Sequence, residues 1–488
     1  MKRIISIINL VCLLICFGSI NIVKADVKNN NGVNMNLSDY YKYKDKNKVE
    51  KNIVDIRKSD VFIKESQYNN NTTLNDDTLN YSAIKEKIYE SLLNIESIID
   101  ISELCKDIHY NDVENILSNY FDTIYEKPDI FYAPNNVSIS YSYDRNTGKL
   151  VICQLKIQYQ YDNSEIQEMT NAFNNKVNYI MEEYLSNSSD ELTLEYIIND
   201  YLLDNVTYDY DNYQSNTIPD ISHTAYGALV NGVAVCDGYA KAVKLLANKL
   251  GIESGIITSD EMNHAWNYIK INGKYYNLDV TFNDPVPETN KRRYTYFNKS
   301  NEEMSTSHTW NTSQYPECND ESFKFLRNYN NNDLSRVNDK LYYLSSNRND
   351  IYSMDLLGSN NKLELQGINP ICMVGYNNTL NFSDGYEVKS YNIKSKEIKT
   401  IYTSEHRIYG LYITDNILNI DSTKIDKISL KINEDFNNDS IIDIEDLSAL
   451  ALRYGISKES DNWKHKYDLN LDNIIDIFDI TMIAKKLQ

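Results

Sequence analysis

The sequence lacks the basic charge and the long apolar runs that mark several protein classes. It holds 49 lysine and arginine residues against 70 aspartate and glutamate residues, a formal net charge of −21. Such an acidic balance excludes nucleic acid and anionic membrane surfaces as expected partners. Beyond the N-terminus, no run approaches the ~20 apolar residues that a membrane-spanning helix requires. We therefore expect no transmembrane segment in the mature chain.

Cysteine is scarce, and its pattern argues against disulfide bonds. Cys12 and Cys16 fall in residues 1–25, which have the basic start, apolar stretch and small-residue end of a secretory signal peptide. The other five are odd in number and widely spaced, unlike a disulfide framework; they are Cys105, Cys153, Cys236, Cys318 and Cys372. We expect a secreted protein, extracellular or cell-surface associated, with free thiols.

The remaining chain predicts a multidomain α+β fold. Residues 26–80 are rich in Asn, Lys, Asp and Ser, which favours a flexible spacer with at most one short helix. Helical periods over 84–99 and 111–125, strands over 137–143 and 150–161, and helices over 165–184 and 192–203 predict an α+β domain. Strand patterns that recur at 39 and 38 residues, from Leu341 to Leu380 to Leu418, predict stacked β-hairpins that separate what precedes them from the chain end. The expected divisions are a signal peptide (1–25), a spacer (26–80), an N-terminal α+β domain (81–200), a catalytic domain (201–313), a β-hairpin-repeat module (314–430) and a C-terminal all-α module (431–488).

A hairpin brings an imidazole and a carboxylate together. Asn272-Gly273 is a strong signal for a two-residue turn between strand formers, with the second strand running from Lys274 to Val280. This turn pairs Ile271 with Lys274, so His264 would face Thr281. His264 and Asp279 would then be diagonal neighbours on one sheet face, about 7–8 Å apart, a distance that their side chains can bridge.

A thiol lies just before a helix in the same region. An apolar stripe of helical spacing follows Cys236 and ends at Gly251, so Cys236 would sit at a helix N-terminus. The helix dipole and the free N–H groups there favour the thiolate and can stabilise an oxyanion. Gly232 and Gly238 would allow close backbone approach on either side.

These motifs resemble the transglutaminase-like branch of the papain-like cysteine enzymes in its secreted bacterial, clostridial form. The matching stretches are His223-Thr-Ala-Tyr-Gly-Ala-Leu, Val235-Cys-Asp-Gly-Tyr-Ala, His264-Ala-Trp-Asn and Tyr276-Asn-Leu-Asp-Val-Thr. The resemblance implies a papain-like, transglutaminase-like core with Cys236 as nucleophile, His264 as general base and acid, and Asp279 as orienting group.

Four other residues near these motifs are candidates for a supporting role. Tyr208 and Asn231 lie upstream at positions suited to a side-chain oxyanion donor. Trp266 either packs in the core or also walls an acyl tunnel. His223 is expected to be structural rather than catalytic.

Two acidic runs near the C-terminus predict paired Ca²⁺ loops. Each run places oxygen donors at loop positions 1, 3, 5, 9 and 12, with a backbone carbonyl at position 7. The second run lies 33 residues after the first, as Asp468 lies after Asp435. The expected ligands are Asp435, Asn437, Asp439, Ile441, Asp443 and Asp446 in the first loop, and Asp468, Asn470, Asp472, Ile474, Asp476 and Asp479 in the second. We expect them to hold two structural Ca²⁺ ions.

The paired loop-helix repeat resembles a type I dockerin, an adhesion module that binds cohesin domains. The resemblance implies a cohesin-domain partner in a surface assembly of the cellulosome or polysaccharide type. It also implies cohesin contacts at loop positions 10 and 11, which are Ile444, Glu445, Ile477 and Phe478. These differ from the Ser-Thr pair common in cellulosomal dockerins, and the two pairs are unequal.

Three functions remain open at this point. The first is a cysteine acyltransferase that acts on protein amide groups. The second is a cysteine peptidase that uses the same triad on a protein or peptide substrate. The third is a surface adhesin or scaffold component that has kept the triad without using it.

Overall fold

The computed structural model divides the chain into two compact units. It describes residues 32–36 and 81–484, apart from 145, 187, 285–291, 330–332, 377, 415–416, 430–434, 437–441, 458–459, 461, 465–466, 468 and 470–473. The predicted signal peptide and most of the predicted spacer lie outside the described residues. Within them, no helix combines the length and apolarity needed to cross a bilayer.

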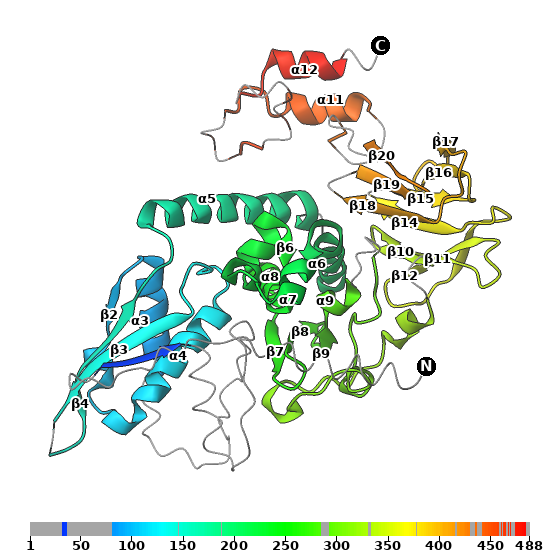
Figure 1. The fold of residues 1–488 in the computed structure, drawn as a ribbon. Helices are drawn as coiled ribbons and strands as arrows, with labels where there is room; N and C mark the ends of the chain where they lie inside the picture. Colours follow the sequence, from blue (N-terminus) through cyan, green and yellow to red (C-terminus); the bar gives the residue numbers. More distant parts are fainter. Residues whose placement is uncertain are drawn as a thin grey trace. The chain divides into compact units, whose positions relative to one another are not determined.

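The first unit is a four-stranded antiparallel sheet with helices. Its strand order is β1-β3-β4-β2, shown in blue and cyan in Figure 1. The elements are β1 (Gly32–Asn36), α3 (Tyr81–Leu93), β2 (Ile98–Asp100), η1 (Ser102–Cys105), η2 (Tyr110–Asp112), the start of α4 (Val113–Glu126), β3 (Asn136–Tyr143) and β4 (Leu150–Ile157). Inward-facing residues of β3 and β4, such as Ile139 and Leu155, are buried.

Two sequence predictions for this unit were wrong. The helix predicted over 84–99 ends at Leu93, and Ile98 begins strand β2. Ile95 takes a left-handed backbone conformation with φ of 55°, which a helix cannot continue through. In the predicted spacer, residues 32–36 form strand β1, which pairs with β3 and so extends the sheet by one strand.

The second unit is built around a helix packed on a three-stranded sheet (Figure 1). Helix α8 packs against β7 and β8, and the sheet order is β7-β8-β9. The elements of this part are α5 (Asn163–Ile180), η3 (Met181–Leu185), α6 (Glu191–Asn205), β5 (Thr207–Tyr208), α7 (Tyr210–Ser215), η4 (Asp220–His223), η5 (Gly227–Asn231), β6 (Val233–Ala234), α8 (Cys236–Lys249), β7 (Ser254–Ser259), β8 (His264–Ile271), β9 (Lys274–Leu278), α9 (Val280–Asn283), α10 (Asn301–Met304), η6 (Thr312–Gln314) and η7 (Lys324–Asn328). The boundary expected between residues 200 and 201 falls inside α6, and the second compact unit includes Asp122–Tyr132 as well as Tyr161–Gln488.

Three antiparallel sheets follow. Their orders are β10-β11-β12-β13, β14-β15-β16-β17 and β18-β19-β20. The strands are β10 (Leu334–Val337), β11 (Lys340–Leu344), β12 (Ile351–Asp355), β13 (Lys362–Leu365), β14 (Cys372–Tyr376), β15 (Thr379–Ser383), β16 (Glu387–Asn392), β17 (Ile398–Thr403), β18 (Gly410–Thr414), β19 (Ile417–Asp421) and β20 (Ile425–Ser429). Leu341, Leu380 and Leu418, which set the period in the sequence, are all fully buried. Each lies in the second strand of its sheet, which is β11, β15 or β19.

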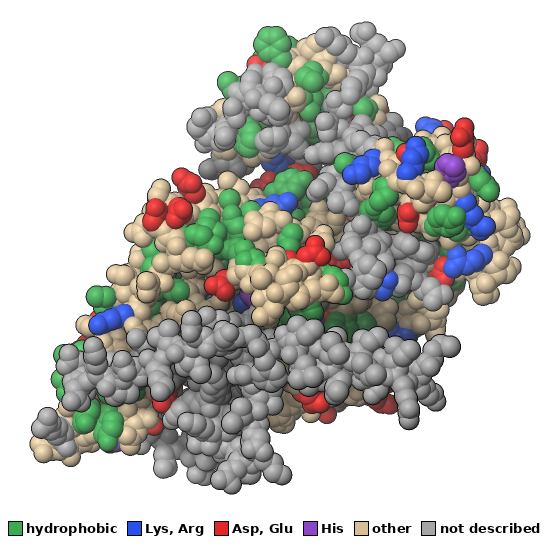
Figure 2. Space-filling model, viewed as in Figure 1, with side chains coloured by type: hydrophobic (Ala, Val, Ile, Leu, Met, Phe, Trp, Pro, Cys, Tyr) green, Lys and Arg blue, Asp and Glu red, His purple; other side chains and the backbone are tan. Residues whose placement is uncertain are grey.

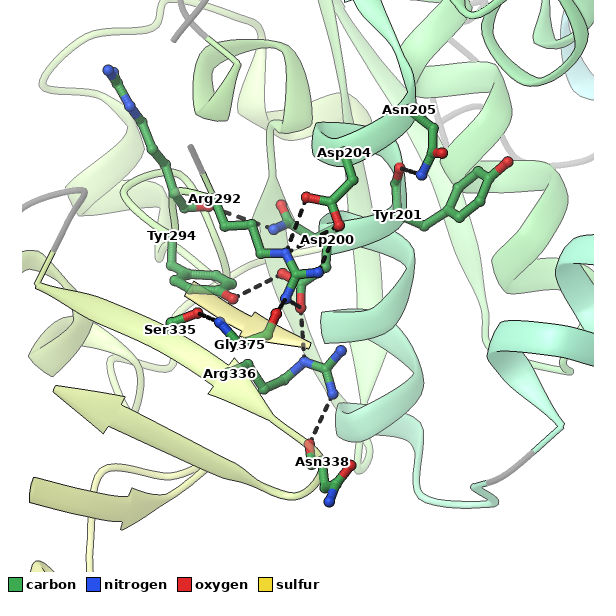
Figure 3. A network of polar contacts seen from close by, with 12 residues as sticks. Asp200, Tyr201, Asp204, Asn205, Arg292, Tyr294, Ser335, Arg336, Asn338 and Gly375 are labelled. Atoms are coloured by element: carbon green, nitrogen blue, oxygen red, sulfur yellow. Dashed lines mark hydrogen bonds and ion pairs between the residues drawn. The ribbon is translucent and has the colours of Figure 1, made fainter. Parts of the chain in front are cut away.

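A buried ionic network joins helix α6 to the first of these sheets (Figure 3). Arg336 of β10 donates from Nε to Oδ2 of Asp200 at 2.8 Å, and Tyr294 donates its hydroxyl to Oδ1 at 2.8 Å. Arg292 binds Asp204 at 2.6 Å and the carbonyl oxygen of Gly375 at 3.2 Å. Since these contacts tie α6 to β10 and β14, the β-rich part packs directly on the helical part.

The C-terminal residues form two equivalent short helices, α11 (Ile444–Ala451) and α12 (Ile477–Ala484). Oδ1 of Asp446 accepts the backbone N–H of Phe436, and Oδ1 of Asp479 accepts that of Leu469, each at 2.7 Å. Both carboxylates are fully buried. The 33-residue offset found in the sequence therefore holds for these hydrogen bonds as well.

Surface charge is dispersed on the face shown in Figure 2. The Lys and Arg side chains coloured there lie singly or in small groups among acidic and uncharged ones, and no continuous basic surface is visible on that face among the described residues.

Candidate active site

The β8-β9 hairpin has the register expected from the sequence. Ile271 pairs with Lys274, and the ladder continues to Asn267 opposite Leu278. Asn272 and Gly273 take φ of 51° and 81°, as a type I′ turn requires. The second strand ends at Leu278 rather than at Val280, so Thr281 is not a strand partner of His264.

Asp279 leaves the sheet to begin the next helix. It is the N-cap of α9, and Oδ1 accepts the backbone N–H of Phe282 at 2.9 Å. Its own N–H donates to the carbonyl oxygen of Tyr296. Asp279 is thereby fixed at the end of β9, at the corner where it was expected to meet His264.

His264 and Asp279 form a short, buried hydrogen bond. Nε2 of His264 lies 2.6 Å from Oδ2 of Asp279, and both side chains are buried. Burial alone would lower the pKa of His264, but the charge of Asp279 outweighs it and raises that pKa to about 10. Burial would also raise the pKa of Asp279, yet the charge of His264 holds it well below its usual range. The pair is therefore expected as imidazolium and carboxylate.

Cys236 begins helix α8, as its sequence context predicts. The helix runs from Cys236 to Lys249, and Gly251 follows with φ of 78°. Its N-cap residue, Val235, makes no side-chain hydrogen bond to the first turn. The Cys236 thiol contributes to raising the pKa of His264, and 6 % of Cys236 remains exposed.

Asn267 fixes strand β8, which carries His264, to helix α8, which begins at Cys236. Its Nδ2 donates to the carbonyl oxygens of Ala240 in α8, at 2.9 Å, and of Gly255 in β7, at 3.1 Å. Because both acceptors are backbone atoms, the spacing between β8 and α8 is set by rigid elements. This gives a structural reason for the asparagine that closes His264-Ala-Trp-Asn.

Of the other candidates, Tyr208 lies near the thiol and Asn231 does not. Burial, followed by the neighbouring Cys236, raises the pKa of Tyr208 well above its usual value, so its hydroxyl remains a donor. Tyr208 pairs with Ala234, two residues before Cys236. Asn231 is exposed at the end of η5, and no side-chain hydrogen bond links it to Cys236, His264 or Asp279 among the described residues.

Trp266 is almost entirely buried behind the site. It packs with Ile257, Met304 and Tyr315, and its Nε1 donates to Oδ1 of Asn277 at 3.1 Å. Its ring stacks on that of His264 with centroids 5.7 Å apart. These are the contacts of a core residue that also supports the imidazole.

His223 contacts the residue that follows Cys236 and binds a different carboxylate from that of Asp279. Its Nδ1 is 2.9 Å from Oδ1 of Asp237. Burial opposes the charge of His223, but the charge of Asp237 prevails and raises the His223 pKa. Lys241 donates to the His223 carbonyl oxygen at 2.8 Å. This cluster holds the loop before α8 rather than the thiol.

One buried residue escaped the sequence analysis. Nε2 of His308 lies 2.9 Å from the same Asp279 oxygen that His264 binds. The ligand atoms of His264, Asp279 and His308 lie within 4.8 Å of one another, so this cluster could in principle hold a metal ion. Both nitrogen atoms are already at hydrogen-bonding distance from Oδ2 of Asp279, which is the geometry of a hydrogen-bonded cluster. A lone histidine in a loop gives no spacing signal, and only Trp310 two residues later marks the segment as partly buried.

The expected Ca²⁺ ligands are only partly within the described residues. Asp435, Asp443, Asp446, Ile474, Asp476 and Asp479 are described, whereas Asn437, Asp439, Ile441, Asp468, Asn470 and Asp472 lie outside them. Asp443 and Asp476 each donate their backbone N–H to the carboxylate at position 12 of the same loop, at 2.9 and 2.7 Å. Carboxylate oxygens are the donors that Ca²⁺ prefers, so the chemistry of the described residues fits this ion.

Comparison with known proteins finds a family match for one part of the chain. No curated protein matches it. Among solved structures, a TGase is similar over 35 % of this chain and 49 % of its own length, at 12 % identity and a TM-score of 0.22. The glutaminyl cyclase of Myxococcus xanthus is similar over 34 % of this chain and 61 % of its own, at 9 % identity and a TM-score of 0.18. The chain thus spans less than two thirds of either structure. Residues 178–280 match the Transglutaminase-like superfamily, and since this segment holds Cys236, His264 and Asp279, the chain contains a transglutaminase-like domain.

Proposed function

We propose that the protein is a cysteine acyltransferase that acts on amide groups of protein substrates through Cys236, His264 and Asp279. The observation that carries this is the buried 2.6 Å bond between His264 and Asp279, together with the influence of the Cys236 thiol on the same imidazole. That order of thiol, imidazole and carboxylate is the one that nucleophilic catalysis by cysteine needs.

The reaction would proceed in two steps. The Cys236 sulfur attacks the carbon of a glutamine carboxamide, a C–S bond forms, and the C–N bond breaks as His264 gives a proton to the departing ammonia. An amine then attacks the thioester carbon, His264 takes up its proton, and the C–S bond breaks to free the thiolate. The backbone N–H of Cys236 and the hydroxyl of Tyr208 would stabilise the oxyanion in both steps.

The experiment follows label transfer, ammonia and new peptide ends together. Purified protein would be incubated with a casein-type substrate, a labelled primary amine and Ca²⁺, beside Cys236→Ala and the matched thiol control Cys372→Ala. We expect Cys236-dependent label incorporation with ammonia release. Cys236-dependent peptide ends without label would instead make it a peptidase. The absence of every signal on several substrates would favour a non-catalytic surface role.

The C-terminal repeat supports a second, independent proposal: that it is a dockerin and recruits the secreted enzyme to a cohesin-bearing surface. The first residues of α11 and α12, Ile444 and Ile477, are 65 % and 53 % exposed, and Phe478 is 65 % exposed. Together with Glu445 they occupy equivalent positions in the two repeats, where they could contact a partner.

Calorimetric titration tests the role of the two loops. We expect two Ca²⁺ ions to bind, and Asp446→Ala and Asp479→Ala each to lose one of them, since each removes the carboxylate at position 12. Glu103→Gln, an exposed carboxylate elsewhere, is the control. Unchanged stoichiometry in both loop variants would refute the calcium assignment, and a failure to bind any cohesin domain in Ca²⁺ would refute recruitment.

A further inference from the structure

Asp279 is held by a second histidine that comes from a different part of the chain. His308 follows helix α10, and its backbone N–H donates to the carbonyl oxygen of Met304 at 2.9 Å. Its ring is fully buried. Nε2 lies 2.9 Å from Oδ2 of Asp279, while His264 binds that same oxygen at 2.6 Å. Two imidazoles therefore share one carboxylate oxygen.

The shared oxygen determines which nitrogen of each ring carries a hydrogen. An ionised carboxylate only accepts hydrogen bonds, so His264 and His308 must each donate from Nε2. Nδ1 of His264 is then left to exchange a proton with the Cys236 thiol. Nδ1 of His308 faces Oγ of Ser307 at 2.9 Å, so this ring has a polar partner on each side.

Packing alone does not account for this arrangement. The His308 ring does lie among aromatic rings, with centroids 4.5 Å from Phe282 and 4.9 Å from Trp266. A ring that only filled space there could be phenylalanine. Instead, a donor is directed at a buried carboxylate whose other oxygen is already bonded to the N–H of Phe282. Three donors thus hold Asp279.

We propose that His308 is a positioning residue that orients Asp279 toward His264 and limits how strongly this carboxylate draws the His264 proton. The inference rests on the proposed function, because the proton on His264 matters only if Cys236 is the nucleophile. Because a hydrogen bond from His308 stabilises the ionised carboxylate, it makes Asp279 less basic and so reduces its attraction for the His264 proton. The His264 imidazolium therefore stays acidic enough to release its proton to a leaving group.

Several polar groups face the cluster of His264, Asp279 and His308. His264 lies on β8, Cys236 on α8 beside Tyr208, and Tyr296 has its ring centroid 5.5 Å from that of His308. Lys299, beside the Tyr296 ring, interacts with the charge of Asp279. All of these are unchanged when only His308 is substituted.

The test compares His308→Phe, which keeps a ring but loses the donor, with His308→Gln, which keeps a donor at similar reach. The readout is the pH dependence of alkylation of Cys236 by iodoacetamide, followed by mass spectrometry of its peptide. This rate reports the imidazole-thiol pair whatever the substrate is. kcat and KM are measured as well if an acyl-transfer or peptidase substrate is found.

In His308→Phe we expect the alkaline transition of the alkylation rate to move up by about one pH unit, the size of one lost charge-assisted hydrogen bond. We expect kcat to fall about tenfold with little change in KM, and His308→Gln to restore most of both. Trp310→Phe, which alters packing against Trp266 in the same core, should leave the transition in place.

Two results would overturn the inference. One is an unchanged transition in His308→Phe. The other is equal behaviour of the Phe and Gln variants, which would make His308 a packing residue. If wild-type protein itself shows no two-step alkylation profile, then the Cys236-His264 pair fails, and with it the proposed function rather than the role of His308. Melting temperatures of all variants show whether each remains folded.

Discussion

At the scale of the residue, His264 depends on one carboxylate for both its orientation and its charge. Its ordinary pKa of 6.5 rises to about 10 because Asp279 outweighs the effect of burial. A group whose pKa is raised by folding stabilises the folded state while it is protonated in both states, and this contribution is lost as pH rises through the folded value.

We therefore expect the free energy of unfolding to fall as pH rises from about 6.5 to about 10. The loss due to His264 should be no more than about 5 kcal/mol, since one pKa unit corresponds to about 1.4 kcal/mol. Urea unfolding at a series of pH values measures it. In Asp279→Asn this part of the slope should disappear, and an identical slope in both proteins would contradict the assignment.

The sequence could predict that His264 and Asp279 meet, but not that His308 joins them. His264 and Asp279 are joined by a short hairpin with a two-residue turn, so period and turn type fix their approach. His308 reaches the same oxygen after a further 29 residues that include the two helices α9 and α10. No local period carries information over such a path.

At the scale of the element, helix α8 places the Cys236 thiol by packing its first turn closely against the residues that precede it. A Cβ atom on Gly238 would lie 2.6 Å from the carbonyl oxygen of Ser222 and 2.9 Å from the Cβ of Ala234. Neither neighbour is the end of a flexible side chain. Glycine is required here for space.

Gly238→Ala should therefore lower stability by about 1–3 kcal/mol, the usual cost of overpacking, and reduce the alkylation rate of Cys236 by shifting the first turn of α8. Gly251→Asn at the other end of the helix is the matched control. No atom would lie within 4 Å of its Cβ, and asparagine tolerates the left-handed conformation. A Gly238→Ala protein as stable and reactive as wild type would show that the turn can relax.

Helices and strands could be predicted where the spacing of apolar residues kept one period, and could not where a helical spacing ran directly into that of a strand. The stripe from Cys236 to Gly251 keeps helical spacing throughout, and the helix begins at Cys236 and ends at Lys249, two residues before Gly251. Near Ile95 the apolar pattern continues into Ile98 and Ile99, which made a helix and a short strand look like one helix. The left-handed turn between them is set by tertiary packing and leaves no mark in the pattern.

At the scale of the whole molecule, buried ion pairs link the helical part of the second unit to its β-rich part. The Arg336 and Asp200 side chains are 11 % and 3 % exposed. The two residues are 136 positions apart, so no local sequence pattern predicts that their segments meet. The β-hairpin period could be read from residues 341–420, but the surface against which these hairpins pack could not.

Removal of one partner should destabilise both parts together. We expect Arg336→Met to lower the free energy of unfolding by about 3–5 kcal/mol, because it removes the guanidinium that is hydrogen-bonded to the buried Asp200 carboxylate and leaves only that of Arg292, 3.7 Å away. Lys106→Ala, which breaks an exposed pair with Glu103, should change it by less than about 1 kcal/mol. Chemical denaturation followed by fluorescence measures both. Equal effects of the two substitutions would mean that the network contributes no more than a surface pair.

The same network bears on how such a chain can be recombined. A crossover between residues 313 and 314 would leave Asp200 in one parent and Arg336 in the other, so most chimaeras would inherit a buried charge without its counterpart. Helix α6 and strand β10 must therefore come from the same parent. The C-terminal 33-residue repeat carries its own small core around Phe436, Leu450 and Ile483, and that makes it the part best suited to exchange as a separate cassette.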